Sequence, residues 1–187
     1  MYIDYLDLTQ PLQWTVDRAL SRARCDAYIA QMTRQAQERA PIVGHDGEPV
    51  VELSTRNNTR VQWDDQAEAD ALLDTVRASV PAVLGGCALV CANPRLRLYR
   101  YGVGERHAAH WDTVVELVEG LHSMLTLVFY LNDDFDGGET HFVELKQSIV
   151  PQAGRALLFQ HRILHEACEV TRGAKYVLRT DVLYRNA

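Results

Sequence analysis

Apolar positions follow a helical period in the first part of the chain. Residues 15–38 repeat small and aliphatic side chains at roughly helical spacing until a proline ends the run. A second helical pattern covers residues 65–79, where Asp65 and Glu68 have the spacing of a capping box before an apolar face begins. The pattern therefore predicts two helices, with the polar stretch 56–61 between them as a turn or a short strand.

From residue 95 the pattern changes to strands separated by glycine-containing turns. The run at 123–132 is apolar almost throughout, which is typical of a strand covered on both faces. Helices followed by many strands predict a β-sandwich or barrel with the helices packed on one outer face. The predicted strands are residues 95–101, 123–132, 139–145, 155–160 and 175–185.

The chain has 187 residues, which fits a single domain with its own hydrophobic core. Within it we expect a mainly helical support region at 1–90 and a catalytic β-core at 95–185. A composition of 47% apolar and 24% charged residues is that of a soluble globular protein. The formal net charge of -6 argues against a nucleic-acid partner, which normally requires a basic face.

The N-terminal segment has neither the basic start nor the apolar core of a signal peptide, and no run is long enough to span a membrane. The four cysteines form no CxxC pair. We therefore expect buried thiols, a cytoplasmic location and no membrane partner. Zinc on Cys87 and Cys91 is the alternative, but the sequence offers it no further ligands at a suitable spacing.

The stretch HAAHWDTV at 107–114 holds the first candidate chemistry. His110 and Asp112 are two residues apart, so in an extended segment both side chains point the same way and can reach one ion. A third ligand must come from elsewhere, and His165 in HRILHEACEV (161–170) is the candidate. Two imidazoles and one carboxylate on one face of an octahedron suit ferrous iron and leave the other positions open for a co-substrate and O2.

A cation in the last predicted strand adds to this site. By strand parity Lys175, Arg179 and Asp181 share one face. A lysine directed into an apolar barrel would bind a carboxylate strongly, because a low dielectric strengthens the ion pair. The alternative is a lysine at a sheet edge or facing solvent. Arg179 is either a second cation for a ligand or a structural partner of Asp181.

Four stretches, in this order along the chain, resemble the catalytic core of the prolyl 4-hydroxylase-like branch of iron(II)/2-oxoglutarate dioxygenases. The similarity covers about half of the chain and implies a double-stranded β-helix, a jelly-roll or cupin-like barrel, whose larger sheet is braced by the N-terminal helices. The stretches are YGVGERHAAHWD (101–112), SMLTLVFYLND (123–133), GGETHF (137–142) and HEACEVTRGAKYVLRTDV (165–182).

The resemblance implies roles for six side chains. The iron(II) ligands would be the two residues of the HxD motif and a distal histidine: His110, Asp112 and His165. Lys175 would bind the distal carboxylate of 2-oxoglutarate, and its position ten residues after His165 favours that histidine over His161. Tyr101 would hydrogen-bond the co-substrate, and Thr126 would lie beside the same carboxylate.

The implied reaction hydroxylates an unactivated C–H bond with O2 and converts 2-oxoglutarate to succinate and CO2, with ascorbate as an optional further cofactor. Related halogenases leave the carboxylate ligand position to chloride, so Asp112 implies hydroxylation. We expect a small-molecule or amino-acid-type substrate. A peptidyl, prolyl-type hydroxylase is the alternative, and a non-catalytic metal-binding β-barrel module is the third reading. His107 and Glu169 stand where collagen-type enzymes often carry an aromatic residue and a proline, which weakens the inference to prolyl hydroxylation.

Two further groups of residues are expected to contact the substrate. The insert 113–122 is unusually apolar for a loop, and Val115 and Leu117 would form a wall of the substrate site. The alternative for this insert is a short helix packed on the core or on the second subunit of a homodimer.

The second group lies on the predicted strands. Arg97 and Tyr99 share strand parity with Tyr101. Together with Arg179 and the polar stretch 56–60, they would bind a carboxylate or an amide of the substrate. The arginines could instead satisfy backbone groups at the ends of the sheet.

Overall fold

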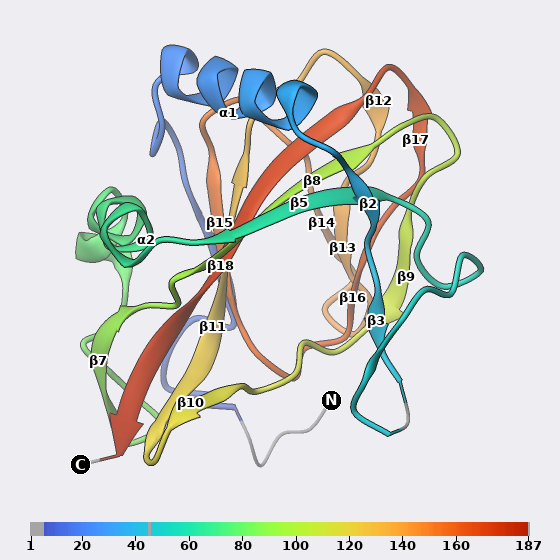
Figure 1. Cartoon of the computed structure of the whole chain (residues 1–187). Helices are drawn as coiled ribbons and strands as arrows, with labels where there is room; N and C mark the ends of the chain where they lie inside the picture. The colour runs from blue at the N-terminus through green and yellow to red at the C-terminus, as the bar shows by residue number, and fades with distance from the viewer. Residues whose placement is uncertain (1–5, 45, 187) are drawn as a thin grey trace.

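The structure is a computed structural model that describes residues 6–44 and 46–186. It is mostly β-structure, with 44% of the residues in strands and 14% in helices. A large twisted sheet carries the helices on its outside, and a smaller sheet lies beside one half of it (Figure 1). In the described part of the chain, no helix has the length and apolar character needed to cross a membrane.

The large sheet has ten strands, and its centre is formed by long strands from the second half of the chain. The main path runs through β1 (Gln13–Val16), β15 (Ala156–Gln160), β11 (Leu121–Tyr130), β18 (Lys175–Asn186), β8 (Arg95–Tyr101), β5 (Thr59–Asp64) and β2 (Glu38–Arg39). Three further strands extend it: β6 (Val83–Leu84), β7 (Cys87–Ala92) and β10 (Glu116–Val118).

The smaller sheet has four short strands, and two of them carry residues of the predicted metal site. Its order is β14 (Gln147–Ile149), β13 (Thr140–Phe142), β16 (His165–Ala167) and β9 (His107–His110). Two isolated pairs complete the strands, namely β12 (Asp136–Gly137) with β17 (Val170–Arg172) and β3 (Ile42–Val43) with β4 (Pro49–Val50).

Two helices occupy the predicted regions but are shorter than expected. Helix α1 (Arg22–Arg34) begins at Ser21, whose hydroxyl accepts a hydrogen bond from the backbone N–H of Arg24. Helix α2 (Gln66–Asp74) is capped by Asp65, which accepts from the N–H of Glu68, and a 3-10 turn follows at Arg77–Ser79. The spacing of Asp65 and Glu68 therefore located the start of α2.

The prediction that residues 1–90 are mainly helical is wrong. Residues on both sides of α1 form the edge strands β1 and β2, and strand β5 pairs with β8 along its whole length. Pairing with the sheet satisfies the backbone N–H and C=O groups of these segments, so it overrides a weak helical pattern.

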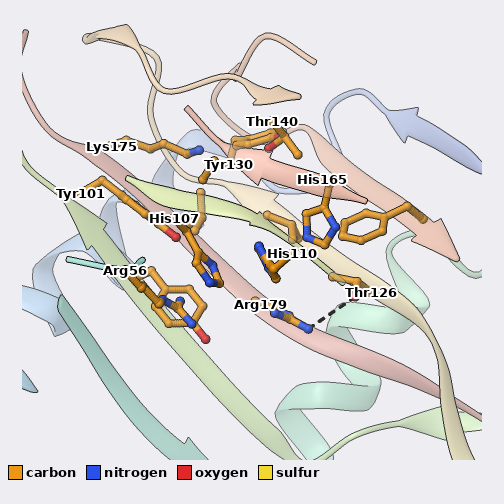
Figure 2. Close-up of a pocket in the computed structure, with 15 residues that line it drawn as sticks. Arg56, Tyr101, His107, His110, Thr126, Tyr130, Thr140, His165, Lys175 and Arg179 are labelled. Carbon is orange, nitrogen blue, oxygen red and sulfur yellow. Dashed lines mark hydrogen bonds between the residues drawn. The ribbon is translucent and has the colours of Figure 1, made fainter. Parts of the chain in front are cut away.

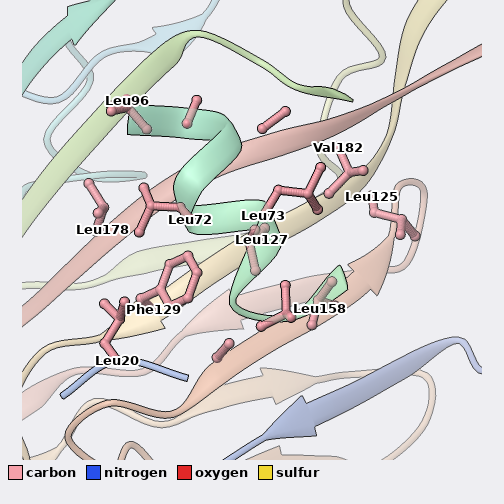
Figure 3. Close-up of a cluster of buried hydrophobic side chains, with 14 of the residues drawn as sticks. Leu20, Leu72, Leu73, Leu96, Leu125, Leu127, Phe129, Leu158, Leu178 and Val182 are labelled. Atoms are coloured by element: carbon pink, nitrogen blue, oxygen red, sulfur yellow. The ribbon is translucent and has the colours of Figure 1, made fainter. Parts of the chain in front are cut away.

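Strand β11 separates two apolar clusters, as its continuous apolar sequence predicts. Leu125, Leu127 and Phe129 face the helices and pack in the cluster that contains Leu72 and Leu73 of α2 (Figure 3). Tyr130 lies in a second cluster on the opposite face, towards the smaller sheet. After the register shift between Ser123 and Leu125, alternate residues of β11 are directed between the two sheets, where the candidate site lies: Thr126, Val128 and Tyr130.

The insert 113–122 does not form the predicted wall or the alternative helix. It is a hairpin in which β10 pairs with the start of β11 around Gly120, a glycine with a positive φ of 71°. Val115 and Leu117 are 39% and 37% exposed, and neither lines the pocket described below. The hairpin continues the large sheet, because residues 121–123 of β11 also pair with β18.

Candidate metal centre and active site

Three predicted ligands converge between the two sheets. His110 ends β9 and His165 begins β16, and these two residues lie directly opposite each other in the strand register. Asp112 follows two residues after His110 and is buried. One donor atom from each of the three residues lies within 4.8 Å of the others. The Asp112 carboxylate is 3.7 Å from Nε2 of each histidine.

Backbone carbonyls fix the orientation of both imidazoles. Nδ1 of His110 donates to the carbonyl of Ala108 at 2.8 Å, and Nδ1 of His165 donates to the carbonyl of Ile163 at 2.9 Å. A carbonyl only accepts, so Nδ1 carries the proton and Nε2 directs its lone pair at the shared point. This hydrogen-bond arrangement is the usual one for histidines that bind a metal.

The charges of the three groups also fit a divalent metal. Burial lowers the pKa of His110 to about 3, and burial lowers the pKa of His165 as well. Burial alone would raise the pKa of Asp112, but Arg179 and the nearby histidines together outweigh it and hold that pKa well below its ordinary value. Neutral pH therefore leaves two neutral imidazoles and one carboxylate, a donor set that suits iron(II).

Asp112 is held by two residues of the large sheet. The Thr126 hydroxyl donates to Asp112 Oδ2 at 2.6 Å, and Arg179 Nη2 lies 2.9 Å from Asp112 Oδ1. Arg179 also pairs with Asp181 at 3.2 Å, and Arg97 pairs with Asp181 at the same distance. Both arginines that were predicted to contact the substrate are therefore engaged by carboxylates of the protein, and Arg97 lies off the pocket wall.

Thr126 lines the same pocket as Lys175 but lies at the metal end of it. The strand register places it opposite Asp181, six residues along β18 from Lys175. At about 3.3 Å per residue, this separation is about 20 Å. Thr126 therefore supports the Asp112 carboxylate, and its assignment to the distal carboxylate of 2-oxoglutarate stays a prediction.

Lys175 lies at the other end of the pocket, in a separate group of polar residues (Figure 2). It is 2% exposed, and its Nζ donates to the carbonyl of Gly138 at 2.6 Å. Burial lowers its pKa to about 8. The Tyr101 ring centroid is 5.2 Å from Nζ, and the ring centroid of Tyr130 is 5.6 Å away. The geometry leaves Lys175 as a buried cation beside tyrosine hydroxyls.

Two residues of this group were missed by the sequence analysis. Tyr130 shares its strand face with Thr126, and its hydroxyl is 2.7 Å from the hydroxyl of Thr140. Thr140 belongs to the GGET stretch (137–140) that carries part of the resemblance. The strand parity of β11 and this motif were therefore available signals, but only the register shows that they meet near Lys175.

His161 is not part of the metal-binding group. It is buried, its Nε2 lies 3.9 Å from Asp181 Oδ1, and neither ring nitrogen has a hydrogen-bond partner in the described structure. His161 and His165 were the two candidates for the third metal ligand. In the structure, only His165 is directed at His110 and Asp112.

Replacing Thr126 with valine is expected to weaken metal binding by about tenfold to a hundredfold, the usual range for a group that orients a metal ligand. Affinity for 2-oxoglutarate at saturating metal should hardly change. Calorimetric titration of each ligand measures both effects. Thr180→Val, which removes a buried hydroxyl bonded to the Asn93 carbonyl, is the control. Lost 2-oxoglutarate affinity with intact metal binding would support the role first assigned to Thr126.

Tyr99 is expected to ionise well below the ordinary tyrosine range. Burial alone would raise its pKa, but the charges of Arg56, Arg97 and Arg179 outweigh it and lower the pKa to about 8. A titration followed by phenolate absorbance should show one early transition that is missing in Tyr99→Phe. Tyr184→Phe is the control, because burial raises the pKa of Tyr184. An unchanged early transition in Tyr99→Phe would show that the pocket does not carry this positive potential.

Comparison with known proteins agrees with this geometry. Residues 96–180 match the family model described as the 2OG-Fe(II) oxygenase superfamily. A putative prolyl 4-hydroxylase of Acanthamoeba polyphaga mimivirus is 30% identical over 100 residues, which are 44% of this chain and 41% of that protein. The chain thus matches less than half of the length of this relative.

Solved structures with the same fold include three prolyl hydroxylases. The viral collagen prolyl hydroxylase of Paramecium Bursaria Chlorella virus-1, solved with 2OG, has a TM-score of 0.69 and 19% identity over 92% of this chain and 96% of its own. The Pseudomonas putida prolyl-4-hydroxylase has a TM-score of 0.66 and 16% identity over 97% and 96%. The Trichoplax adhaerens prolyl hydroxylase, in complex with a peptide fragment of hypoxia inducible factor, has a TM-score of 0.71 and 16% identity over 96% and 86%.

These similarities confirm the double-stranded β-helix. They also agree with the implied cofactors, since iron(II), 2-oxoglutarate and O2 are those of the family. Residues 96–180 are therefore similar to the 2OG-Fe(II) oxygenase superfamily, and the fold of the chain resembles that of the prolyl hydroxylases.

Proposed function

We propose that the chain is an iron(II)- and 2-oxoglutarate-dependent dioxygenase that hydroxylates an unactivated C–H bond of its substrate. One observation carries this proposal: the donor atoms of His110, Asp112 and His165 converge in the same pocket that contains the buried Lys175. The three ligands would hold iron(II), which supplies the O2 chemistry when it is bound together with 2-oxoglutarate.

The protein's own contribution is to position and shield the reactants. Lys175 would bind the distal carboxylate of 2-oxoglutarate, with the hydroxyls of Tyr101, Tyr130 and Thr140 available as donors. The Phe159 ring packs against His165 with a centroid distance of 4.5 Å and closes one side of the pocket. A dry pocket strengthens the ion pair at the lysine and holds the co-substrate in one orientation.

For the substrate, the prolyl-hydroxylase relatives and the peptide-bound neighbour support the peptidyl alternative over our first expectation of a free small molecule. We therefore propose a prolyl-type residue in a peptide as the target, with a free amino-acid-type substrate as the second candidate. We also propose that the chain is one domain, because β1, β2 and β5 belong to the same sheet as the core strands.

The test is succinate formation from 2-oxoglutarate by protein reconstituted with iron(II) under air. We expect turnover that requires iron and is stimulated by proline-containing peptides more than by free L-proline or other amino acids. Stimulation only by free amino acids would favour the second candidate. Protein that binds iron(II) and 2-oxoglutarate but forms no succinate with any of these substrates would contradict the proposal and support the non-catalytic binding module.

A further inference from the structure

Arg56 is a buried cation in the pocket wall, on the same side as Tyr101 and His107 (Figure 2). It is 7% exposed and forms an isolated β-bridge with His107. The His107 ring stacks on the metal-ligand candidate His110 with a centroid distance of 3.6 Å. Arg56 therefore lies on the metal side of the pocket, away from the surface of the protein.

The contacts of Arg56 are with amide, carbonyl and phenol groups, and, despite burial, the two phenols, Tyr99 and Tyr101, raise its pKa. Its Nε donates to Asn58 Oδ1 at 2.8 Å, and its Nη1 donates to the Pro41 carbonyl at 3.4 Å. Its guanidinium carbon lies 4.5 Å from the centroid of the Tyr99 ring. Among the described residues, no carboxylate is recorded within ion-pair distance of this guanidinium.

A buried charge of this kind is costly, and buried arginines are normally paired with an anion. The other two cations of the pocket wall have such partners. Arg179 pairs with Asp112 and Asp181. Under the proposed function, Lys175 takes the distal carboxylate of 2-oxoglutarate. Arg56 is then the cation whose charge neither the described protein nor the co-substrate neutralises.

The electrostatic potential of the pocket agrees with this charge balance. Burial would raise the pKa of Tyr99, yet the neighbouring arginines, with Arg56 as the strongest influence, lower it. A group that stabilises a buried phenolate would also stabilise a carboxylate placed nearby. Stacking on Tyr99 and the bond to Asn58 hold the guanidinium in one orientation, so little entropy is lost when a ligand binds.

We propose that Arg56 forms an anion subsite that binds a carboxylate of the primary substrate. This proposal rests on the proposed function, because it assumes that 2-oxoglutarate occupies the Lys175 end. The carboxylate comes either from a free amino acid or from an acidic residue next to the target residue of a peptide. Both sources present the same planar group, which a guanidinium binds through two parallel hydrogen bonds.

Charge-matched probe pairs test the subsite without turnover. The protein is loaded with Mn(II) and 2-oxoglutarate under nitrogen, and binding is measured by calorimetry. One pair is L-proline and L-prolinamide; the other is acetyl-Ala-Pro-Glu-amide and acetyl-Ala-Pro-Gln-amide. We expect the carboxylate member of at least one pair to bind about tenfold tighter or more than its amide, as for a charge-assisted hydrogen bond. The pair that shows the preference identifies the source.

Variants assign the preference to Arg56. Arg56→Gln should abolish it, and Arg56→Lys should retain part of it because the charge remains. Arg60→Gln, which removes an arginine that pairs with Glu38 outside the pocket, should leave the preference unchanged. Thermal unfolding of each variant shows whether it is folded. If Arg56→Gln does not fold, the proposal is tested by the probe preference of the wild-type protein and by its reduction in Arg56→Lys.

The proposal is overturned if no carboxylate probe binds better than its amide to the wild-type protein, or if the preference persists in Arg56→Gln. It is also overturned if Arg56→Gln weakens 2-oxoglutarate binding and leaves the probe preference intact, because Arg56 then belongs to the co-substrate site. Failure of the proposed function would appear separately, as absence of iron-dependent succinate formation from protein whose probe preference is normal.

Discussion

Replacing His165 with alanine is expected to lower both iron(II) affinity and succinate formation by a factor on the order of 1000. Loss of one of three ligands removes several kcal/mol of metal stabilisation, and each 1.4 kcal/mol corresponds to a factor of ten. The backbone carbonyl of Ile163 orients this imidazole so that Nε2 faces the other two ligands. Asp112 is a less clear choice, because its removal would also take away one of the two carboxylate partners of Arg179.

Anaerobic calorimetry with iron(II) and a succinate assay under air measure the two effects. His141→Ala is the matched control, because His141 lies on the neighbouring strand β13 and bonds to Ser148 instead of joining the three ligands. The control should keep both iron affinity and activity. An alanine variant at 165 with normal iron affinity would show that another residue completes the metal site.

Replacing Lys175 with alanine is expected to weaken 2-oxoglutarate binding by about 100-fold, since truncating one partner of a buried charge pair costs about 2–5 kcal/mol. Metal affinity without 2-oxoglutarate should remain, because Lys175 lies at the other end of the pocket. In the wild-type protein, burial lowers the pKa of Lys175 to about 8. Only the protonated amine attracts the carboxylate, so 2-oxoglutarate affinity should fall as the pH rises through this range.

Titration of metal-loaded protein with 2-oxoglutarate at several pH values measures both predictions. Lys146→Ala, a change at an exposed lysine, is the control. Nearly unchanged affinity in Lys175→Ala would mean that the co-substrate binds elsewhere. A loss of metal affinity in the same variant would mean that the pocket as a whole has been disturbed.

The sequence predicted features that depend on spacing within one segment. The alternation around His110 and Asp112 placed two ligands on one side, and the apolar run of β11 predicted a strand between two cores. Asp65 and Glu68 marked the beginning of α2. In each case the relevant contacts are local, or they follow from the repeat of a single strand or helix.

Features that depend on pairing between distant segments were not predictable in this way. Thr126 and Tyr130 share one strand face, and only the register with β18 shows which of them lies near Lys175. Strand β1 pairs with β15 at the edge of the sheet, although the alternation of apolar and polar residues in β1 is weak. The burial of Arg56 likewise depends on its bridge to His107, which is far away in the chain.

The measurement that tests the central claim most directly is a crystal structure of the protein grown under nitrogen with iron(II) and 2-oxoglutarate. We expect one metal ion within about 2.2 Å of Nε2 of His110, Nε2 of His165 and an oxygen of Asp112. The distal carboxylate of 2-oxoglutarate should contact Lys175. A metal ion bound by other residues, or 2-oxoglutarate bound outside the pocket, would contradict the account.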